Sequence, residues 1–91
     1  MKPSEIQFAL NLEALSAPQC RRIVQALVEK PLTANELAKA CKLTTASVQK
    51  HLELLIRSGL VRLISKDGNE VLKLERPTLQ PTIDWFADLI H

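Results

Sequence analysis

The sequence predicts a mainly helical fold that carries one β-hairpin. Through most of the chain, apolar residues recur every three to four positions, which is the period of an amphipathic helix. After Gly59 the period changes to two, and Asp67-Gly68 in the middle of this stretch is a strong hairpin signal. A chain of 91 residues is expected to form a single domain, residues 1–91, with a modest core.

Charge is distributed unevenly along the chain, although the net charge is only +2. Residues 17–76 hold eleven basic and six acidic side chains, whereas both ends are slightly acidic. A basic centre suits a polyanion, and acidic, apolar ends suit contacts with protein. No apolar run approaches the roughly 20 residues that a membrane span needs, and no secretory leader is recognisable, so we expect a cytoplasmic protein without a membrane partner.

Two helices are predicted before Pro31. Residues 4–15 are apolar over a wide arc, which is typical of a helix buried on two sides, and in so small a protein the second side is expected to contact another subunit. Ser16 followed by Gln19 predicts a capping box for the next helix. That helix is expected to run to Lys30 and to stop at Pro31.

A helix-turn-helix is predicted next. Thr33 and Glu36 form a second capping box, which opens a short helix. Its inward side chains are expected to be Leu37, Ala38 and Ala40. A tight turn at 41–43 leads to Thr44, whose hydroxyl can cap a helix over residues 44–58, and Gly59 can end that helix in a left-handed conformation. In such a pair, the second helix is the candidate recognition helix.

The helix at 44–58 has two unlike faces. An apolar stripe is formed at helical spacing by Val48, Leu52, Leu55 and Ile56. The opposite face carries Ala46, Gln49, Lys50, Glu53 and Arg57. Hydroxyls, an amide and a lysine on the N-terminal turns are groups that contact base edges and phosphates in a DNA major groove, although an ordinary solvated helix carries them too.

The hairpin and the chain end complete the predicted fold. Strands are expected at residues 60–65 and 70–75, which makes a two-stranded wing directly after the helix-turn-helix. Pro77 and Pro81 interrupt the chain, and Pro81 is expected to open a last, strongly apolar helix. We expect the first and last helices to form a dimer interface. The predicted interface residues are Ile6, Leu10, Ile83, Trp85, Phe86, Leu89 and Ile90.

Most of residues 12–62 consists of two segments, LEALSAPQCRRIVQAL and NELAKACKLTTASVQKHLELLIRSGLVR. Both segments resemble the corresponding parts of the ArsR-type winged helix-turn-helix repressors. The coinciding positions are Val48, His51, Leu52, Leu55, Gly59 and Leu60. The resemblance implies a homodimeric regulator of transcription that binds double-stranded DNA at a palindromic operator and is released by a chemical signal. It also implies that the groove-facing residues are Thr45, Ala46, Ser47, Gln49 and Lys50.

Other basic residues are candidates for phosphate contacts. Lys42 lies in the predicted turn, while Arg62 and Lys66 lie in the predicted wing. Arg21 or Arg22, early in the second helix, could clamp a phosphate as well. Asp67 and Glu70 offset Lys66 at the wing tip, so this wing should contribute less to phosphate binding than a basic wing would.

The sensing motifs of the resembled family are missing. The short helix lacks the Cys-x-Cys pair of the arsenic and cadmium sensors, and the last helix lacks the Asp-x-His start of the zinc and nickel sensors. Asp84, Asp88 and His91 are therefore expected to be ordinary surface residues, with no metal and no cofactor bound. Cys20 and Cys41 are expected to be reduced, semi-buried thiols, and the effector is unknown.

Enzymatic activity is not expected. The chain has no glycine-rich phosphate loop, and neither histidine has a carboxylate or cysteine partner at a catalytic spacing. His51 is predicted to be a structural hydrogen-bonding residue. Two alternatives to a DNA-binding repressor of unknown signal are a winged-helix interaction module in a larger assembly and a thiol-responsive repressor that uses Cys20 and Cys41.

Overall fold

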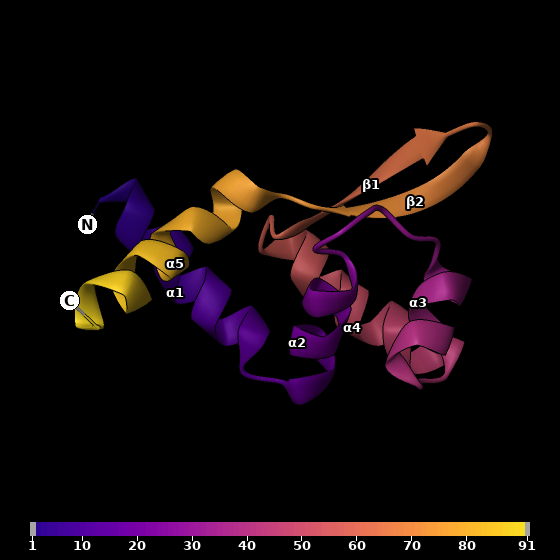
Figure 1. Cartoon of the computed structure of the whole chain (residues 1–91), viewed down its shortest axis with the longest axis horizontal. Coiled ribbons are helices and arrows are strands. Elements are labelled where there is room, and N and C mark those ends of the chain that lie inside the picture. Colours follow the sequence, from indigo (N-terminus) through magenta and orange to yellow (C-terminus); the bar gives the residue numbers. More distant parts are fainter. Residues whose placement is uncertain (1, 91) are drawn as a thin grey trace.

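A helix-turn-helix with its hairpin occupies one end of the molecule, and two side-by-side helices occupy the other (Figure 1). The computed structural model describes residues 2–90. Their elements are α1 (Pro3–Leu15), α2 (Pro18–Ala26), α3 (Ala34–Cys41), α4 (Thr45–Arg57), β1 (Val61–Lys66), β2 (Asn69–Leu74) and α5 (Arg76–Leu89). The predicted class, a mainly helical winged helix-turn-helix with a two-stranded wing, is confirmed. None of these helices combines the length and the apolar character needed to cross a bilayer.

The core lies where α2, α3 and α4 pack together. Its largest fully buried side chains include Ile23 of α2, Leu37 of α3, and Val48 and Leu55 of α4. Each complete burial of such a side chain contributes roughly 1.5–3 kcal/mol of hydrophobic free energy. Leu52 belongs to this core as predicted, but Ile56 does not, because its side chain is 43% exposed on the flank of α4 that faces the wing.

Helix α4 ends as the sequence predicts, at a glycine with positive φ. Gly59 has φ of 85°, its amide donates to the carbonyl oxygen of Ile56, and the Leu60 amide donates to that of Leu55. These two bonds form a Schellman motif, and the accompanying hydrophobic contact is supplied by the fully buried Leu55 and Leu60. The motif turns the chain sharply from α4 into β1.

The wing is an antiparallel pair, with Val61 opposite Leu74 and Lys66 opposite Asn69. Both strands are offset by one residue from the predicted ranges. Asp67 and Gly68 form the two-residue turn with φ of 52° and 79°, and positive φ at both positions matches the twist of a tight hairpin. Leu32 also bridges Leu72, which ties the α2–α3 loop to the wing; nothing in the local sequence pattern indicated this pairing.

Helix α2 differs from the prediction at both ends. Ser16 still has helical dihedral angles as the C-cap of α1, and its hydroxyl donates to the Glu13 carbonyl oxygen at 2.7 Å. The predicted Ser16–Gln19 capping box is therefore wrong, and the extended Ala17 is the N-cap instead. The helix ends at Ala26 rather than Lys30. In α3, Ala40 is exposed and Cys41 is buried, so the prediction of an inward Ala40 is also wrong.

Helix α5 begins earlier than predicted and contains both prolines. It starts at Arg76 with Pro77 in its first turn, where a missing N–H costs nothing, and it continues through Pro81. An interior proline removes one backbone hydrogen bond and is expected to cost about 3 kcal/mol. Packing along α1 and side-chain hydrogen bonds to Thr78 and Thr82 offset this cost on either side of Pro81.

Those hydrogen bonds come from Asn11, a fully buried polar residue of α1. Its Nδ2 donates to the Thr78 carbonyl oxygen at 2.8 Å and to Thr82 Oγ1 at 3.0 Å. Its Oδ1 accepts from Gln7 Nε2 at 2.9 Å, and the same Gln7 nitrogen donates to the carbonyl oxygen of Ser58, the C-cap of α4, at 2.8 Å. One amide thus links α1 to α5 and, through Gln7, to the end of α4.

Replacing Asn11 by alanine should destabilise the protein by about 2 kcal/mol, because it leaves buried polar partners unsatisfied and opens a small cavity. Urea denaturation followed by circular dichroism measures this difference. Asn35→Ala, on the exposed first turn of α3, is the matched control and should change the free energy of unfolding by less than about 0.5 kcal/mol. Equal stabilities of the two variants would contradict a linking role for Asn11.

Candidate nucleic-acid interface

The turn between α3 and α4 is built by local hydrogen bonds at both helix ends. Thr33 caps α3: the Glu36 amide donates to Thr33 Oγ1 at 3.1 Å, and the Thr33 amide donates to Glu36 Oε1 at 2.9 Å. This predicted capping box is confirmed, and its hydrogen bonds lower the pKa of Glu36. Thr44 caps α4 by accepting from the Ser47 amide at 3.1 Å, as predicted.

Lys42 is the turning point between the two helices. Its φ of 55° and ψ of 45° are left-handed, a conformation that glycine adopts more readily. The Lys42 amide donates to the Lys39 carbonyl oxygen, and the Leu43 amide donates to that of Ala38. This is again a Schellman motif, with lysine where glycine is usual. A cationic side chain therefore stands exposed at the junction of α3 and α4.

The N-terminal turns of α4 present an exposed polar surface. Exposed there are Thr45, Ala46, Gln49 and Lys50, whereas Ser47 is half-buried. The first turn of α4 has no acidic side chain, so the unpaired backbone amides and the helix dipole make this end attractive to an anion. The structure thus brings four of the five groups that were predicted to face DNA together on one exposed surface, whereas the Ser47 hydroxyl lies near the His51 ring, 3.5 Å from Nδ1.

His51 lies on the inner side of the same helix. Its Nδ1 is 2.7 Å from the Ser47 carbonyl oxygen and 3.5 Å from Ser47 Oγ, and the ring is half-buried. The residue therefore holds the local packing of α4, in agreement with the structural role predicted for it.

The two wing candidates have different surroundings. Arg62 lies at the base of the wing, where its Nε is 2.9 Å from Glu75 Oε1, without the alignment of a hydrogen bond. Lys66 lies at the tip beside the Asp67-Gly68 turn and is exposed. Its ammonium is thus available to a phosphate, whereas the Arg62 guanidinium is partly neutralised by its carboxylate partner.

The two arginines of α2 also have different surroundings. Arg21 Nη1 donates to the carbonyl oxygens of Leu15 at 2.7 Å and Ser16 at 3.1 Å, so it caps the end of α1. Arg22 lies close enough to Cys41 to oppose the increase in the pKa of that thiol. Because Cys41 adjoins Lys42, Arg22 is the better of the two candidates for a phosphate contact, a distinction that helical spacing alone did not provide.

Both thiols are buried and free. Burial raises the pKa of Cys20 and that of Cys41, which lowers the fraction of reactive thiolate at neutral pH. The Cys20 sulfur faces the His51 carbonyl oxygen at 3.9 Å, within the packing of α2 on α4. These surroundings suit two packing residues better than a thiol switch.

Among residues 2–90, no group of three His, Cys, Asp or Glu side chains is arranged to hold a metal ion. Asp84 accepts a hydrogen bond from Gln80 Nε2 at 2.8 Å on the exposed side of α5. His91, which was considered together with Asp84 and Asp88, lies outside the described residues.

Comparison with known proteins agrees with this geometry. Residues 15–64 match the family model described as a helix-turn-helix domain, while no curated protein matches the chain. A solved ArsR family transcriptional regulator is similar with a TM-score of 0.76 at 26% identity, over 91% of this chain and 91% of that one. An ArsR-like transcriptional regulator from Rhodococcus sp. RHA1 has a TM-score of 0.83 at 20% identity, over 97% and 83% of the two chains.

A third similar structure is the homodimeric winged helix-turn-helix DNA-binding domain of a possible ArsR-family regulator from Mycobacterium bovis. It has a TM-score of 0.74 at 16% identity, over 97% of this chain and 88% of that one. The fold and the exposed end of α4 therefore define a winged helix-turn-helix protein. The chain belongs to the helix-turn-helix domain family and is a DNA-binding transcriptional regulator of the ArsR type, a class of proteins that are not enzymes.

The left-handed conformation of Lys42 yields a direct prediction for stability. Lys42→Gly should be about 1 kcal/mol more stable than Lys42→Ala, because only glycine adopts positive φ without a steric cost. Urea denaturation of the two variants measures the difference. If Lys42→Ala proves the more stable of the two, residue 42 does not turn the chain in a left-handed conformation.

Proposed function

We propose that the protein is a homodimeric repressor that binds a palindromic operator in double-stranded DNA. The N-terminal turns of α4 from each subunit enter successive major grooves, with half-sites about one helical turn apart. The observation that carries this proposal is the exposed, acid-free and capped N-terminal end of α4. A cytoplasmic location and a single domain over residues 1–91 belong to the same proposal.

The residues of α4 have distinct roles in the proposed complex. Gln49 pairs with adenine through two hydrogen bonds, and Lys50 contacts guanine or a phosphate. Ala46 contacts a thymine methyl group, while Thr45 and Ser47 bind phosphate or base edges. These roles are supported by the position of each residue on the first two turns of α4.

Phosphate contacts flank this recognition surface. Lys42 contacts the DNA backbone from the turn before α4, and Arg22 adds a second phosphate contact from α2. Lys66 contacts the backbone from the wing tip, and Arg62 contributes less because Glu75 is its partner. Such contacts fix the register of the protein on DNA and make its affinity depend on salt.

The proposed dimer interface is the apolar surface of α1 and α5. Its residues are Ile6, Leu10, Ile83, Trp85, Phe86, Leu89 and Ile90, all of them exposed in the isolated chain. The ring centroids of Trp85 and Phe86 are 5.1 Å apart, and those of Phe8 and Trp85 are 5.4 Å apart, which makes an aromatic ridge across both helices. An apolar surface of this extent is typical of a subunit interface, and the similar Mycobacterium bovis domain is homodimeric.

Lys50→Ala should weaken operator binding by about 1–3 kcal/mol, because it removes a cation from the proposed protein–DNA interface of each subunit. If Lys50 binds phosphate, the slope of log affinity against log salt should also fall by about 0.9 for each phosphate that the variant no longer neutralises. Fluorescence anisotropy with operator DNA, selected from a random palindromic library, measures both quantities at several salt concentrations.

Lys2→Ala is the matched control for charge. Lys2 is the N-cap of α1, and α1 with α5 forms the end of the molecule away from the α3–α4 turn (Figure 1). Its removal should leave affinity and salt dependence nearly unchanged. Failure of the selection to enrich any sequence, or equal effects of the two substitutions, would refute recognition by α4.

Phe86→Glu should convert the dimer into a monomer at micromolar concentration. The substitution puts a charge on a side chain that is 52% exposed in the isolated chain and that dimerisation is proposed to bury. Sedimentation equilibrium measures the change in mass. Val28→Glu, an exposed apolar residue outside α1 and α5, is the control and should remain dimeric. A monomeric wild type would instead favour the interaction module with a different partner.

A further inference from the structure

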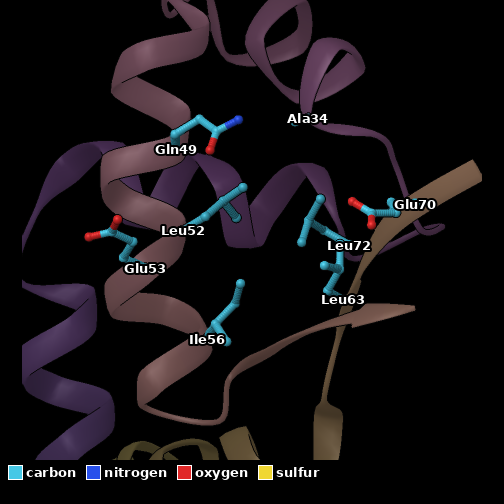
Figure 2. A pocket seen from close by; sticks show the side chains of 8 residues that line it. All are labelled: Ala34, Gln49, Leu52, Glu53, Ile56, Leu63, Glu70 and Leu72. Carbon is cyan, nitrogen blue, oxygen red and sulfur yellow. The ribbon is translucent and has the colours of Figure 1, made fainter. Parts of the chain in front are cut away.

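A groove lies between the recognition helix and the wing (Figure 2). Its volume is about 200 Å³. The groove is lined by Ala34, Gln49, Leu52, Glu53, Ile56, Leu63, Glu70 and Leu72. None of these side chains belongs to α1 or α5, so the groove is separate from the proposed dimer interface.

The lining residues of this groove follow the helical spacing of α4 and the alternation of the wing strands. Gln49, Leu52, Glu53 and Ile56 are spaced i, i+3, i+4 and i+7, so they share one flank of α4. The prediction that Gln49 and Glu53 lie on the face opposite Leu52 and Ile56 is wrong at this flank. In the wing, Leu63 pairs with Leu72, and residue 70 lies two positions before Leu72 on the same face. The groove is therefore a junction of one helix face and one sheet face.

The floor of the groove is apolar and incompletely covered. Leu52 and Leu72 are buried beneath it, but Ile56 is 43% exposed and Leu63 is 47% exposed. Of the exposed large apolar side chains in the described chain, only these two and Val28 lie outside the region of α1, α5 and the adjoining Ile90. Ile56 and Leu63 thus offer an apolar contact surface that neither the core nor the proposed dimer interface covers.

The polar groups of the groove give it a preferred charge. In Figure 2, the Glu70 carboxylate and the Gln49 amide point into the gap from opposite sides, whereas the Glu53 carboxylate is turned away from the gap. Within residues 2–90, neither Glu53 nor Glu70 forms an ion pair. A carboxylate without an ion-pair partner among the described residues, Glu70, beside an apolar floor favours a cation and repels a phosphate.

We propose that this groove binds a small amphipathic cation, a protonated amine on a compact apolar body. The ammonium group donates to Glu70 and to the Gln49 side-chain oxygen, while the apolar body covers Ile56 and Leu63. The small volume and the facing walls of α4 and the wing suit a small molecule rather than a protein segment.

Because Gln49 lines the groove, a ligand bound there should affect DNA binding. This step rests on the proposed function. A ligand that binds the Gln49 amide withdraws it from the adenine that it is proposed to contact. The bound ligand should therefore weaken operator binding. Binding of the cation itself does not depend on DNA, so the two proposals can fail separately.

The test is a titration of the full chain, labelled with ¹³C at Ile and Leu methyl groups, by NMR. Three probes share one apolar body and differ in charge: cyclohexylmethylammonium, cyclohexylmethanol and cyclohexanecarboxylate. The ammonium probe should shift the methyl signals of Ile56 and Leu63 and should bind about tenfold more tightly than the alcohol, since a charge-assisted hydrogen bond contributes about 1.4 kcal/mol more than a neutral one.

Glu70→Gln should reduce the affinity for the ammonium probe about tenfold, to that of the alcohol. Glu29→Gln, which removes an exposed carboxylate in the α2–α3 connection, is the matched control and should not change it. Equal binding of ammonium and alcohol to the wild type, methyl shifts confined to α1 and α5, or no shifts up to the solubility of the probe would each overturn the proposal.

The effect on DNA is measured separately by adding the ammonium probe to the wild-type protein–operator complex at constant ionic strength. Dissociation that the alcohol does not cause, and that Glu70→Gln suppresses, is the expected result. If the probe binds the groove without displacing DNA, the coupling through Gln49 is wrong while the cation site stands. If no operator is bound at all, the proposed function fails and the methyl titration still decides the site.

Discussion

The buried amide of Asn11 is the interaction on which the arrangement of the two ends depends. It joins α1 to α5 directly, and through Gln7 it joins both to the C-cap of α4. Apolar contacts between α1 and α5 specify their register less strictly than a buried amide does, because hydrophobic forces are non-directional. A buried amide has fixed hydrogen-bond directions and a high cost when unsatisfied, so it selects one register. The position of the aromatic ridge relative to the recognition helix follows from that register.

The molecule therefore has two surfaces with opposite chemistry at its two ends. The end formed by α3 and α4 is polar and presents Lys42, Lys50 and an acid-free helix N-terminus. The end formed by α1 and α5 exposes the aromatic ridge of Trp85 and Phe86. In a symmetric dimer, joining the apolar ends places the two polar ends apart on one assembly. This separation is what the proposed binding to two half-sites requires, and the Asn11 hydrogen bonds join the elements that set it.

The groove between α4 and the wing lies at the edge of the proposed DNA surface. The Glu70 carboxylate is unfavourable beside a phosphate backbone, which is a reason to expect that it serves another contact. Gln49 lines this groove and also stands among the proposed base-contacting residues. One side chain is thus shared between two proposed ligands of opposite charge. Such sharing would couple the two binding events through a single amide, without any movement of the dimer interface.

The sequence by itself determined those features that depend on neighbouring residues. The capping box at Thr33 and Glu36, the Thr44 cap, the Gly59 end of α4 and the Asp67-Gly68 turn are all local hydrogen-bonding or dihedral preferences. For the same reason the exposed end of α4 could be located from the sequence. The family inferred from the sequence was also correct.

Tertiary structure decided what depends on partners distant in the chain. Ser16 bonds back to α1 instead of capping α2, and α5 continues through Pro81 because α1 packs against it. Asn11 gave no signal in the sequence, since one polar residue in an apolar helix predicts exposure until its partners at Thr78 and Thr82 are known. The ion pair between Arg62 and Glu75 and the position of Ile56 beside the wing depend on how the hairpin packs, which the local sequence does not show. Local preferences contribute a few tenths to about 1 kcal/mol each, and burial of a side chain or a polar network outweighs them.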